Sequence, residues 1–144
     1  MGYTKNGAIE EMQAAGEKLA SAAENGDTAG AREALEAGAW PETRLAGDPV
    51  IQGATLNGHV EIVKLLLEDG ADANSSGTSG STPLHRCIGT HTGPAHVEIV
   101  RMLLAAGVDI GAEDDSGHRV YDYVEDIEDE DIRDEMSAAI LAAC

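Results

Sequence analysis

The stretch from Gly58 to Asn74 reads G-H-V-E-I-V-K-L-L-L-E-D-G-A-D-A-N. Its apolar residues recur at helical spacing between Val60 and Leu67, while the charged residues among them take the opposite side. Gly70 ends this pattern, because glycine adopts the left-handed conformation that terminates a helix at little cost. The stretch therefore predicts an amphipathic helix that must bury one flank against another element.

The same pattern recurs on both sides of this helix. Residues 26–39 read G-D-T-A-G-A-R-E-A-L-E-A-G-A, and residues 96–109 read H-V-E-I-V-R-M-L-L-A-A-G-V-D. The helix-ending glycines, Gly38, Gly70 and Gly107, are separated by 32 and 37 residues. Repeats of this length are typical of a stacked array of small helical units.

A second motif, S-T-P-L-H at residues 81–85, precedes the last of these helices. The coupled motifs resemble the ankyrin repeat family, in which T-P-L-H opens the first helix of a repeat and G-H-V-E-I-V opens the second. The resemblance covers roughly residues 15–125. It implies an all-α ankyrin repeat solenoid of helix–turn–helix units with β-hairpin fingers, about three repeats followed by a divergent C-terminal cap.

The domain organisation follows from this periodicity. We expect residues 1–13 to form an N-terminal arm and residues 14–144 a single ankyrin repeat domain. Its approximate units are residues 14–46, 47–79 and 80–115, with residues 116–144 as the cap. In the cap the T-P-L-H motif is absent, but Ile132, Met136 and Ile140 keep one apolar stripe, which predicts a helix with one face buried and one in solvent.

The array departs from the family pattern at three places. Residues 48–52 read D-P-V-I-Q instead of T-P-L-H, so we expect the hydrogen bonding by threonine and histidine to be lost and the array to be weaker there. The finger N-S-S-G-T-S-G-S-T-P at residues 74–83 is rich in Ser and Gly, which predicts mobility. Pro83 and His96 are 13 positions apart where the pattern has 9, so an insertion should bulge within residues 89–95.

Composition restricts the classes of partner. Hydrophobic residues make up 42% of the 144 residues, with no Phe, as closely packed short helices require. The net charge of −18 argues against direct binding of nucleic acid or of an anionic membrane, since both attract Lys and Arg. Electrostatic recognition would favour a basic protein partner.

Neither a membrane span nor a signal peptide is predicted, and two cysteines make no disulfide framework. We therefore expect a monomer in the cytoplasm with reduced thiols.

The sequence carries no pattern of an enzyme. It lacks a G-x-S-x-G elbow, a phosphate-binding loop and a dinucleotide fingerprint, so we expect neither catalysis nor a cofactor. His85, Cys87, His91 and His96 lie close together and raise the alternative of a zinc site. The resemblance assigns three of them to the repeat pattern, which leaves too few ligands for a closed site.

The resemblance implies that a partner protein binds the concave surface formed by the fingers and first helices. Trp40 has two interpretations, a side chain folded back on the arm or a neighbouring hairpin, and an anchor that binds the partner. The candidate contacts placed by this pattern are Trp40, Glu42, Arg44, Gln52, Asn74, Arg86 and His118.

The second candidate surface is acidic. Between Asp109 and Glu135 there are 13 acidic residues and two arginines. These carboxylates form either a solvated face of the cap or a surface that attracts a basic partner. In the latter case the protein would act as an inhibitor or immunity-type protein that neutralises a basic toxin, a nuclease or another nucleic-acid-binding protein. The candidate acidic patch consists of Glu125, Asp126, Glu128, Asp129, Glu130 and Asp131.

Overall fold

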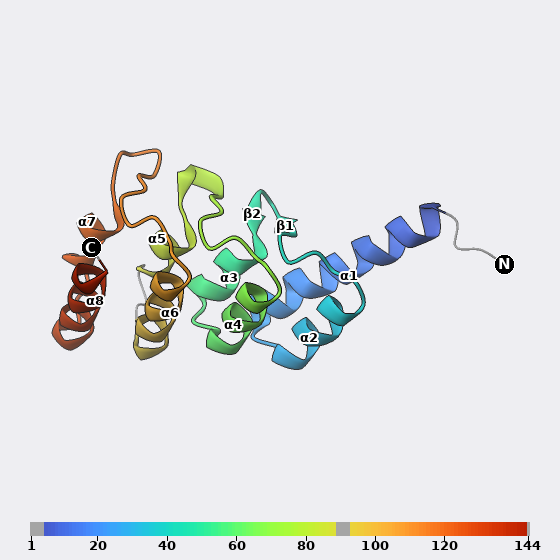
Figure 1. Cartoon of the computed structure of the whole chain (residues 1–144), viewed down its shortest axis with the longest axis horizontal. Coiled ribbons are helices and arrows are strands. Elements are labelled where there is room, and N and C mark those ends of the chain that lie inside the picture. The colour runs from blue at the N-terminus through green and yellow to red at the C-terminus, as the bar shows by residue number, and fades with distance from the viewer. Residues whose placement is uncertain (1–4, 89–92, 144) are drawn as a thin grey trace.

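The computed structural model describes residues 5–88 and 93–143, and within these residues the α-helices form four successive pairs (Figure 1). The first helices contact one another in series, and so do the second helices, which gives two parallel rows. The predicted all-α solenoid is confirmed. The pairs are α1 (Lys5–Asn25) with α2 (Thr28–Glu36), α3 (Val50–Leu56) with α4 (Val60–Glu68), α5 (Pro83–Cys87) with α6 (Pro94–Ala105), and α7 (Val120–Val124) with α8 (Glu130–Ala142).

The connections between pairs form fingers that project to the same side of the stack (Figure 1). In the first finger, β1 (Arg44–Leu45) pairs antiparallel with β2 (Asp48–Pro49). The turn between them has positive φ at Ala46 (53°) and Gly47 (90°), the combination that suits the twist of a two-residue hairpin. The second finger contains a short 3₁₀ turn, η1 (Thr78–Gly80).

The core runs along the stack between the two rows of helices. In the first pair it is made of small residues such as Ala23, Ala31 and Ala34, which allow α1 and α2 to approach closely. In the cap, Met136 and Ile140 are almost fully buried and α8 packs on α6, as the apolar stripe predicted. None of the helices in the described parts of the chain is long and apolar enough to cross a membrane.

Helix α1 is much longer than the other first helices. It has 21 residues, whereas α3 has 7 and α5 has 5. The boundary expected after residue 13 falls inside this helix, so the described part of the arm continues the first repeat without a loop. Figure 1 shows the N-terminal part of α1 extending past α2 and away from the stack.

The insertion in repeat three ends where α6 begins. Pro94 occupies the first turn of α6, where its missing N–H costs nothing. The backbone N–H of Gly93 donates to Nδ1 of His96 (3.1 Å), which fixes the helix start. Residues 89–92, including His91, lie outside the described residues.

Candidate protein-binding surface

Two side chains join a first helix to the following finger. Gln52 stands in α3 where His85 stands in α5, each two residues before a buried small residue, Ala54 or Cys87. Nε2 of His85 lies 3.0 Å from the carbonyl oxygen of His118. Nε2 of Gln52 donates to the carbonyls of Ser81 (2.6 Å) and Ser75 (2.9 Å). The hydrogen bonding by threonine and histidine is absent at repeat two, but a glutamine amide bridges that seam in its place. The expected weakness of the array there stays a prediction.

Two further histidines, one at α4 and one in α6, join these second helices to the preceding pair. Nε2 of His59 lies 3.0 Å from the carbonyl oxygen of Glu24. Nε2 of His96 lies 3.0 Å from the carbonyl oxygen of Leu56. Each carbonyl is at the C-terminal end of a first helix, where it has no partner within that helix. The stack is thus held by repeated side-chain bridges.

These bridges engage the residues that suggested a zinc site. His85 and His96 use their ring nitrogens within the stack, and the Sγ of Cys87 donates to the carbonyl oxygen of His96 (3.1 Å). Burial raises the pKa of the Cys87 thiol far above its ordinary value, so it is held as the neutral thiol. The described residues contain no group of three or more His, Cys, Asp or Glu that could hold a metal ion.

Polar side chains also connect neighbouring fingers. The carboxylate of Glu42 accepts hydrogen bonds from the backbone N–H of Asp72 and from the hydroxyl of Ser75. Oδ1 of Asn74 accepts from the N–H of Asp109 (2.8 Å), so Asn74 repeats in the second finger the role of Glu42 in the first. Each side chain fixes the position of the next finger.

The second finger is bound to the first at several further points. Nη1 of Arg44 donates to the carbonyl of Ser76 (3.0 Å). Oδ1 of Asp48 accepts from both the backbone N–H (2.7 Å) and the hydroxyl (3.0 Å) of Thr78. A finger rich in Ser and Gly is thus cross-linked by hydrogen bonds, because its small residues let the backbone approach the first finger.

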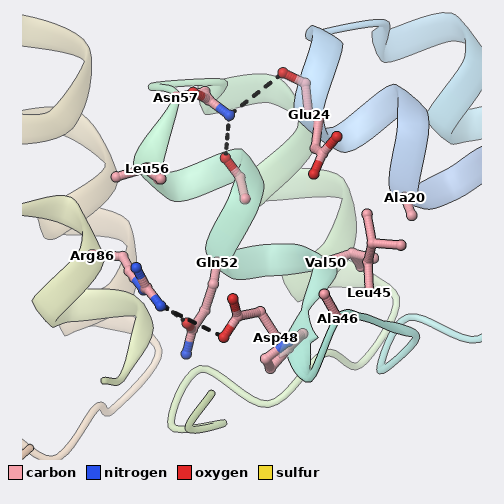
Figure 2. Close-up of a pocket in the computed structure, with 12 residues that line it drawn as sticks. Ala20, Glu24, Leu45, Ala46, Asp48, Val50, Gln52, Leu56, Asn57 and Arg86 are labelled. Atoms are coloured by element: carbon pink, nitrogen blue, oxygen red, sulfur yellow. Dashed lines mark hydrogen bonds and ion pairs between the residues drawn. The ribbon is translucent and has the colours of Figure 1, made fainter. Parts of the chain in front are cut away.

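Arg86, Gln52 and Asp48 converge at the base of these fingers (Figure 2). Nε of Arg86 donates to Oε1 of Gln52 (3.2 Å), and its Nη2 lies 3.6 Å from Oδ1 of Asp48. Gln52 is only 2% exposed, so it presents almost no surface to a partner. It bridges α3 to the second finger and also positions Arg86, which remains partly accessible.

A concave pocket of about 210 Å³ lies beside this cluster, between α1, α3 and the first finger. Figure 2 shows the side chains that line it, with Leu45 and Leu56 among the apolar ones. Both leucines are exposed, by 46% and 45%. Glu24 and Asp48 supply carboxylates at the same pocket. A fixed polar cluster beside uncovered apolar side chains is the composition of a small recognition site.

Trp40 and His118 occupy opposite parts of the row of fingers. Trp40 is 68% exposed and lies beside the N-terminal part of α1. His118 is also exposed, with its ring centroid 5.4 Å from that of Tyr123 and its Nδ1 3.9 Å from Oδ1 of Asp114. The structure does not bring these two candidates together, so one small ligand could not contact both.

The acidic patch lies at the end of the stack opposite the free end of α1 (Figure 1). It connects α7 to the first turn of α8, and all six of its residues are exposed. Arg133 lies 3.8 Å from the carboxylate of Glu130 and offsets part of the charge at the start of α8. The patch and the concave pocket are therefore two separate surfaces.

The side of the domain formed by α1, the first finger, α3 and α5 is here called the inner face. The sequence did not single out its exposed apolar residues, Ile9, Met12, Leu45 and Leu56. Ile9 and Met12 could have been found, since they are three residues apart in a segment that continues the first helical pattern. Leu45 gave no such signal, because its exposure depends on the hairpin that carries it.

Comparison with known proteins identifies the family to which this architecture belongs. The family described as "Ankyrin repeats (3 copies)" matches residues 19–114, and the chain belongs to that family. It is 39% identical over 69 residues to the mouse (Mus musculus) Ankyrin repeat and SOCS box protein 16, an alignment covering 48% of this chain and 15% of that protein. It is 43% identical over 82 residues to the Probable E3 ubiquitin-protein ligase XBOS33 of Oryza sativa subsp. japonica, covering 54% of this chain and 16% of that protein. The chain thus spans less than a fifth of either relative.

Proposed function

We propose that this domain binds a partner protein through its inner face, between α1 and α5. Ankyrin repeats are generally non-catalytic modules for protein–protein interaction. The observation that supports the proposal most directly is the concave pocket, where a fixed Arg86–Gln52–Asp48 cluster borders two exposed leucines.

The proposed mechanism is recognition by a rigid surface. Arg44 and Asn74 are already held by hydrogen bonds to neighbouring fingers, and Arg86 is held by hydrogen bonds to Gln52 and Thr78. Little side-chain entropy therefore remains to be lost on binding. Leu45 and Leu56 supply apolar contact at the centre, and Trp40 extends it along the first finger. His118 would contact only a partner long enough to reach the third finger.

The proposal is tested by capturing a partner with the tagged domain and measuring its binding after purification. We expect Leu45→Ser combined with Leu56→Ser to weaken binding about 30-fold, the effect of losing central apolar anchors. Leu141→Ser is the matched control, because Leu141 is exposed by 57% at the other end of the stack. Equal binding by the double variant and the wild type would refute the proposal.

A second candidate function is supported by the uniform exposure of the acidic patch. In that case the domain inhibits a basic toxin, a nuclease or a nucleic-acid-binding protein, and binding depends on charge. Replacing the six patch carboxylates by their amides should lower the association rate, and so should added salt. Binding through the concave pocket should be affected far less by either change.

A further inference from the structure

A second hollow continues the concave pocket along α1 and is here called the N-terminal groove. It has a volume of about 600 Å³ and lies between α1 and the first finger. Ala20 and Leu45 line both the groove and the concave pocket, so the two form one continuous surface. The groove is lined by Ile9, Met12, Gln13, Gly16, Glu17 and Ala20 from α1 and by Trp40, Thr43, Arg44 and Leu45 from the first finger.

Exposed apolar side chains gather in this groove. Within the described parts of the chain, seven large apolar residues are exposed, and they are Ile9, Met12, Trp40, Leu45, Leu56, Tyr121 and Leu141. The first four all line the N-terminal groove. Their exposed fractions of 46% to 68% leave a large apolar area in water. A concentration of this kind marks an interaction surface, whereas scattered exposed apolar residues do not.

The length of α1 creates one wall of the groove. Ile9, Met12, Gly16 and Ala20 are three or four residues apart and therefore share one face of the helix. Gly16 keeps the floor open: a Cβ at this position would lie 3.4 Å from Cγ2 of Thr43, and any longer side chain would enter the hollow. No other first helix in the described residues extends in this way.

The charges along the groove define the chemistry of its occupant. Glu17 lines the groove and Glu24 lines the adjoining pocket. Neither carboxylate forms an ion pair within the described residues. Arg44 already donates to the carbonyls of Gly47 and Ser76. Free anions beside an apolar hollow, in a chain of net charge −18, complement a cation.

We propose that the N-terminal groove binds a partner-protein segment in which a large apolar side chain is flanked by Lys or Arg. The apolar side chain lies among Ile9, Met12 and Trp40, and the cation pairs with Glu17. This inference rests on the proposed function of the inner face and names the chemistry of the segment that face recognises.

The test uses a randomised library of short linear peptides displayed on phage and selected on the folded domain. For the wild type we expect enriched peptides to combine an aromatic or long aliphatic residue with a neighbouring Lys or Arg. One enriched peptide is then synthesised with a fluorescent label, and its affinity is measured for each variant.

Two kinds of variant distinguish binding inside the groove from non-specific binding to an exposed apolar surface. Trp40→Ser combined with Met12→Ser should weaken the peptide about 30-fold through loss of the apolar anchors. Gly16→Leu should weaken it by at least tenfold although it adds apolar surface, because the new side chain fills the hollow. Leucine also favours a helix more than glycine does, so this variant should fold. Leu141→Ser is the control that should leave the affinity unchanged.

The charge requirement is tested separately. Glu17→Gln should lower the affinity about threefold at low salt and abolish the preference for Lys and Arg in a repeated selection, while the apolar preference persists.

Each result has a defined meaning. Tighter or unchanged binding by Gly16→Leu refutes the claim that the peptide lies in the N-terminal groove. An unchanged preference for Lys and Arg in Glu17→Gln refutes the claim that the cation pairs with Glu17. Peptides lost with Leu56→Ser but not with the groove variants leave the proposed function intact and refute this inference. Failure to enrich any peptide refutes the inference, and the captured-partner measurement then decides the proposed function. Peptides lost only when the acidic patch is neutralised support the inhibitor candidate.

Discussion

At α3 a glutamine amide reaches across to the next finger, and at α5 an imidazole reaches across in the same way. We call the surroundings of Gln52 the polar seam and those of His85 the histidine seam. Nε2 of Gln52 meets the carbonyl of Ser81 at 2.6 Å, and Nε2 of His85 meets the carbonyl of His118 at 3.0 Å. The two acceptors precede the equivalent helices α5 and α7.

The neighbours of the two bridges differ. In the polar seam, Arg86 and Asp48 surround Gln52 and tie two fingers together. In the histidine seam, the ring of Tyr123 meets that of His85 edge-on, with centroids 6.1 Å apart, and its hydroxyl donates to the carboxylate of Asp114. In both seams this position carries a planar side chain whose N–H reaches the carbonyl that precedes the next first helix. The surroundings then determine how each seam responds to substitution and to pH.

The largest effect should come from adding a methyl group to the polar seam. In Gly77→Ala the new Cβ would overlap Oδ1 of Asp48 and lie 2.8 Å from Oε1 of Gln52, so both side chains must shift and weaken the hydrogen bonds that they form in the polar seam. We expect a loss of about 3 kcal/mol in the free energy of unfolding, measured by urea denaturation. Gly93→Ala is the control, since no atom of the described residues lies within 4 Å of a Cβ at this position, and it should cost less than about 0.5 kcal/mol. Equal effects would show that the polar seam is not closely packed.

Removing the amide is expected to have the next largest effect. Gln52→Ala removes the hydrogen bonds from the buried amide to the carbonyls of Ser75 and Ser81 and takes one acceptor from the guanidinium of Arg86. The expected cost is about 2 kcal/mol in the same denaturation experiment. Gln13→Ala, which removes an exposed glutamine, should change stability by less than about 0.5 kcal/mol. A cost for Gln52→Ala as small as that of the control would refute its bridging role.

Exchanging the two bridging residues tests their equivalence directly. Gln52→His and His85→Gln should each cost about 1 kcal/mol or less, because each new side chain retains a planar N–H donor. His85→Ala should cost about 2 kcal/mol, since the hydrogen bonds that join its buried ring to Thr82 and to the carbonyl of His118 are then lost. If the exchanges cost as much as the alanine variants, the seams have different geometric requirements.

The smallest effect is confined to the extremes of pH. Hydrogen bonds from the Tyr123 hydroxyl and the backbone N–H of His118 hold the pKa of Asp114 below its ordinary value of 3.8. Its contribution to stability is therefore complete above that pH and is lost as the pH falls through the lower folded value. The hydrogen bond to Asp114 also raises the pKa of Tyr123 above 10.0, so the contribution of Tyr123 is lost as the pH rises through the higher folded value.

Asp114→Asn should thus flatten the acid side of the stability profile, measured as the urea midpoint against pH. Asp126→Asn, at an exposed carboxylate of the cap, serves as the control. If the urea midpoints of Asp114→Asn and the wild type fall in the same way as the pH is lowered, Asp114 does not contribute to the stability of the histidine seam.

The repeated fold could be predicted from the sequence because its signals are local. Helical periodicity between Val60 and Leu67, the motif at residues 81–85 and the recurring glycines each depend on a few neighbouring residues. The polar seam could not be predicted in this way. Gln52 lies in a stretch, D-P-V-I-Q, that departs from the family motif, and its bonds join residues 23 and 29 positions away.

The candidate site was predictable only as a region. Placement on the inner face followed from the repeat pattern, but that pattern did not show that Glu42, Asn74 and Arg44 are also held in place by bonds between fingers. The N-terminal groove was missed because it needs both the continued α1 helix and the hairpin opposite it. Neither segment by itself shows that the space between them stays open.

The sequence by itself determined the unit, its period and the excess of negative charge, since these are properties of neighbouring residues and of composition. Only the tertiary structure decided which polar side chains are consumed in joining fingers and which remain free for a partner. The physical reason is that burial and hydrogen bonding depend on where two groups lie relative to each other, and these groups can be far apart in the sequence. Gln52 and Glu17 are both polar residues on first helices, yet stacking buries one against the next finger and leaves the other in solvent.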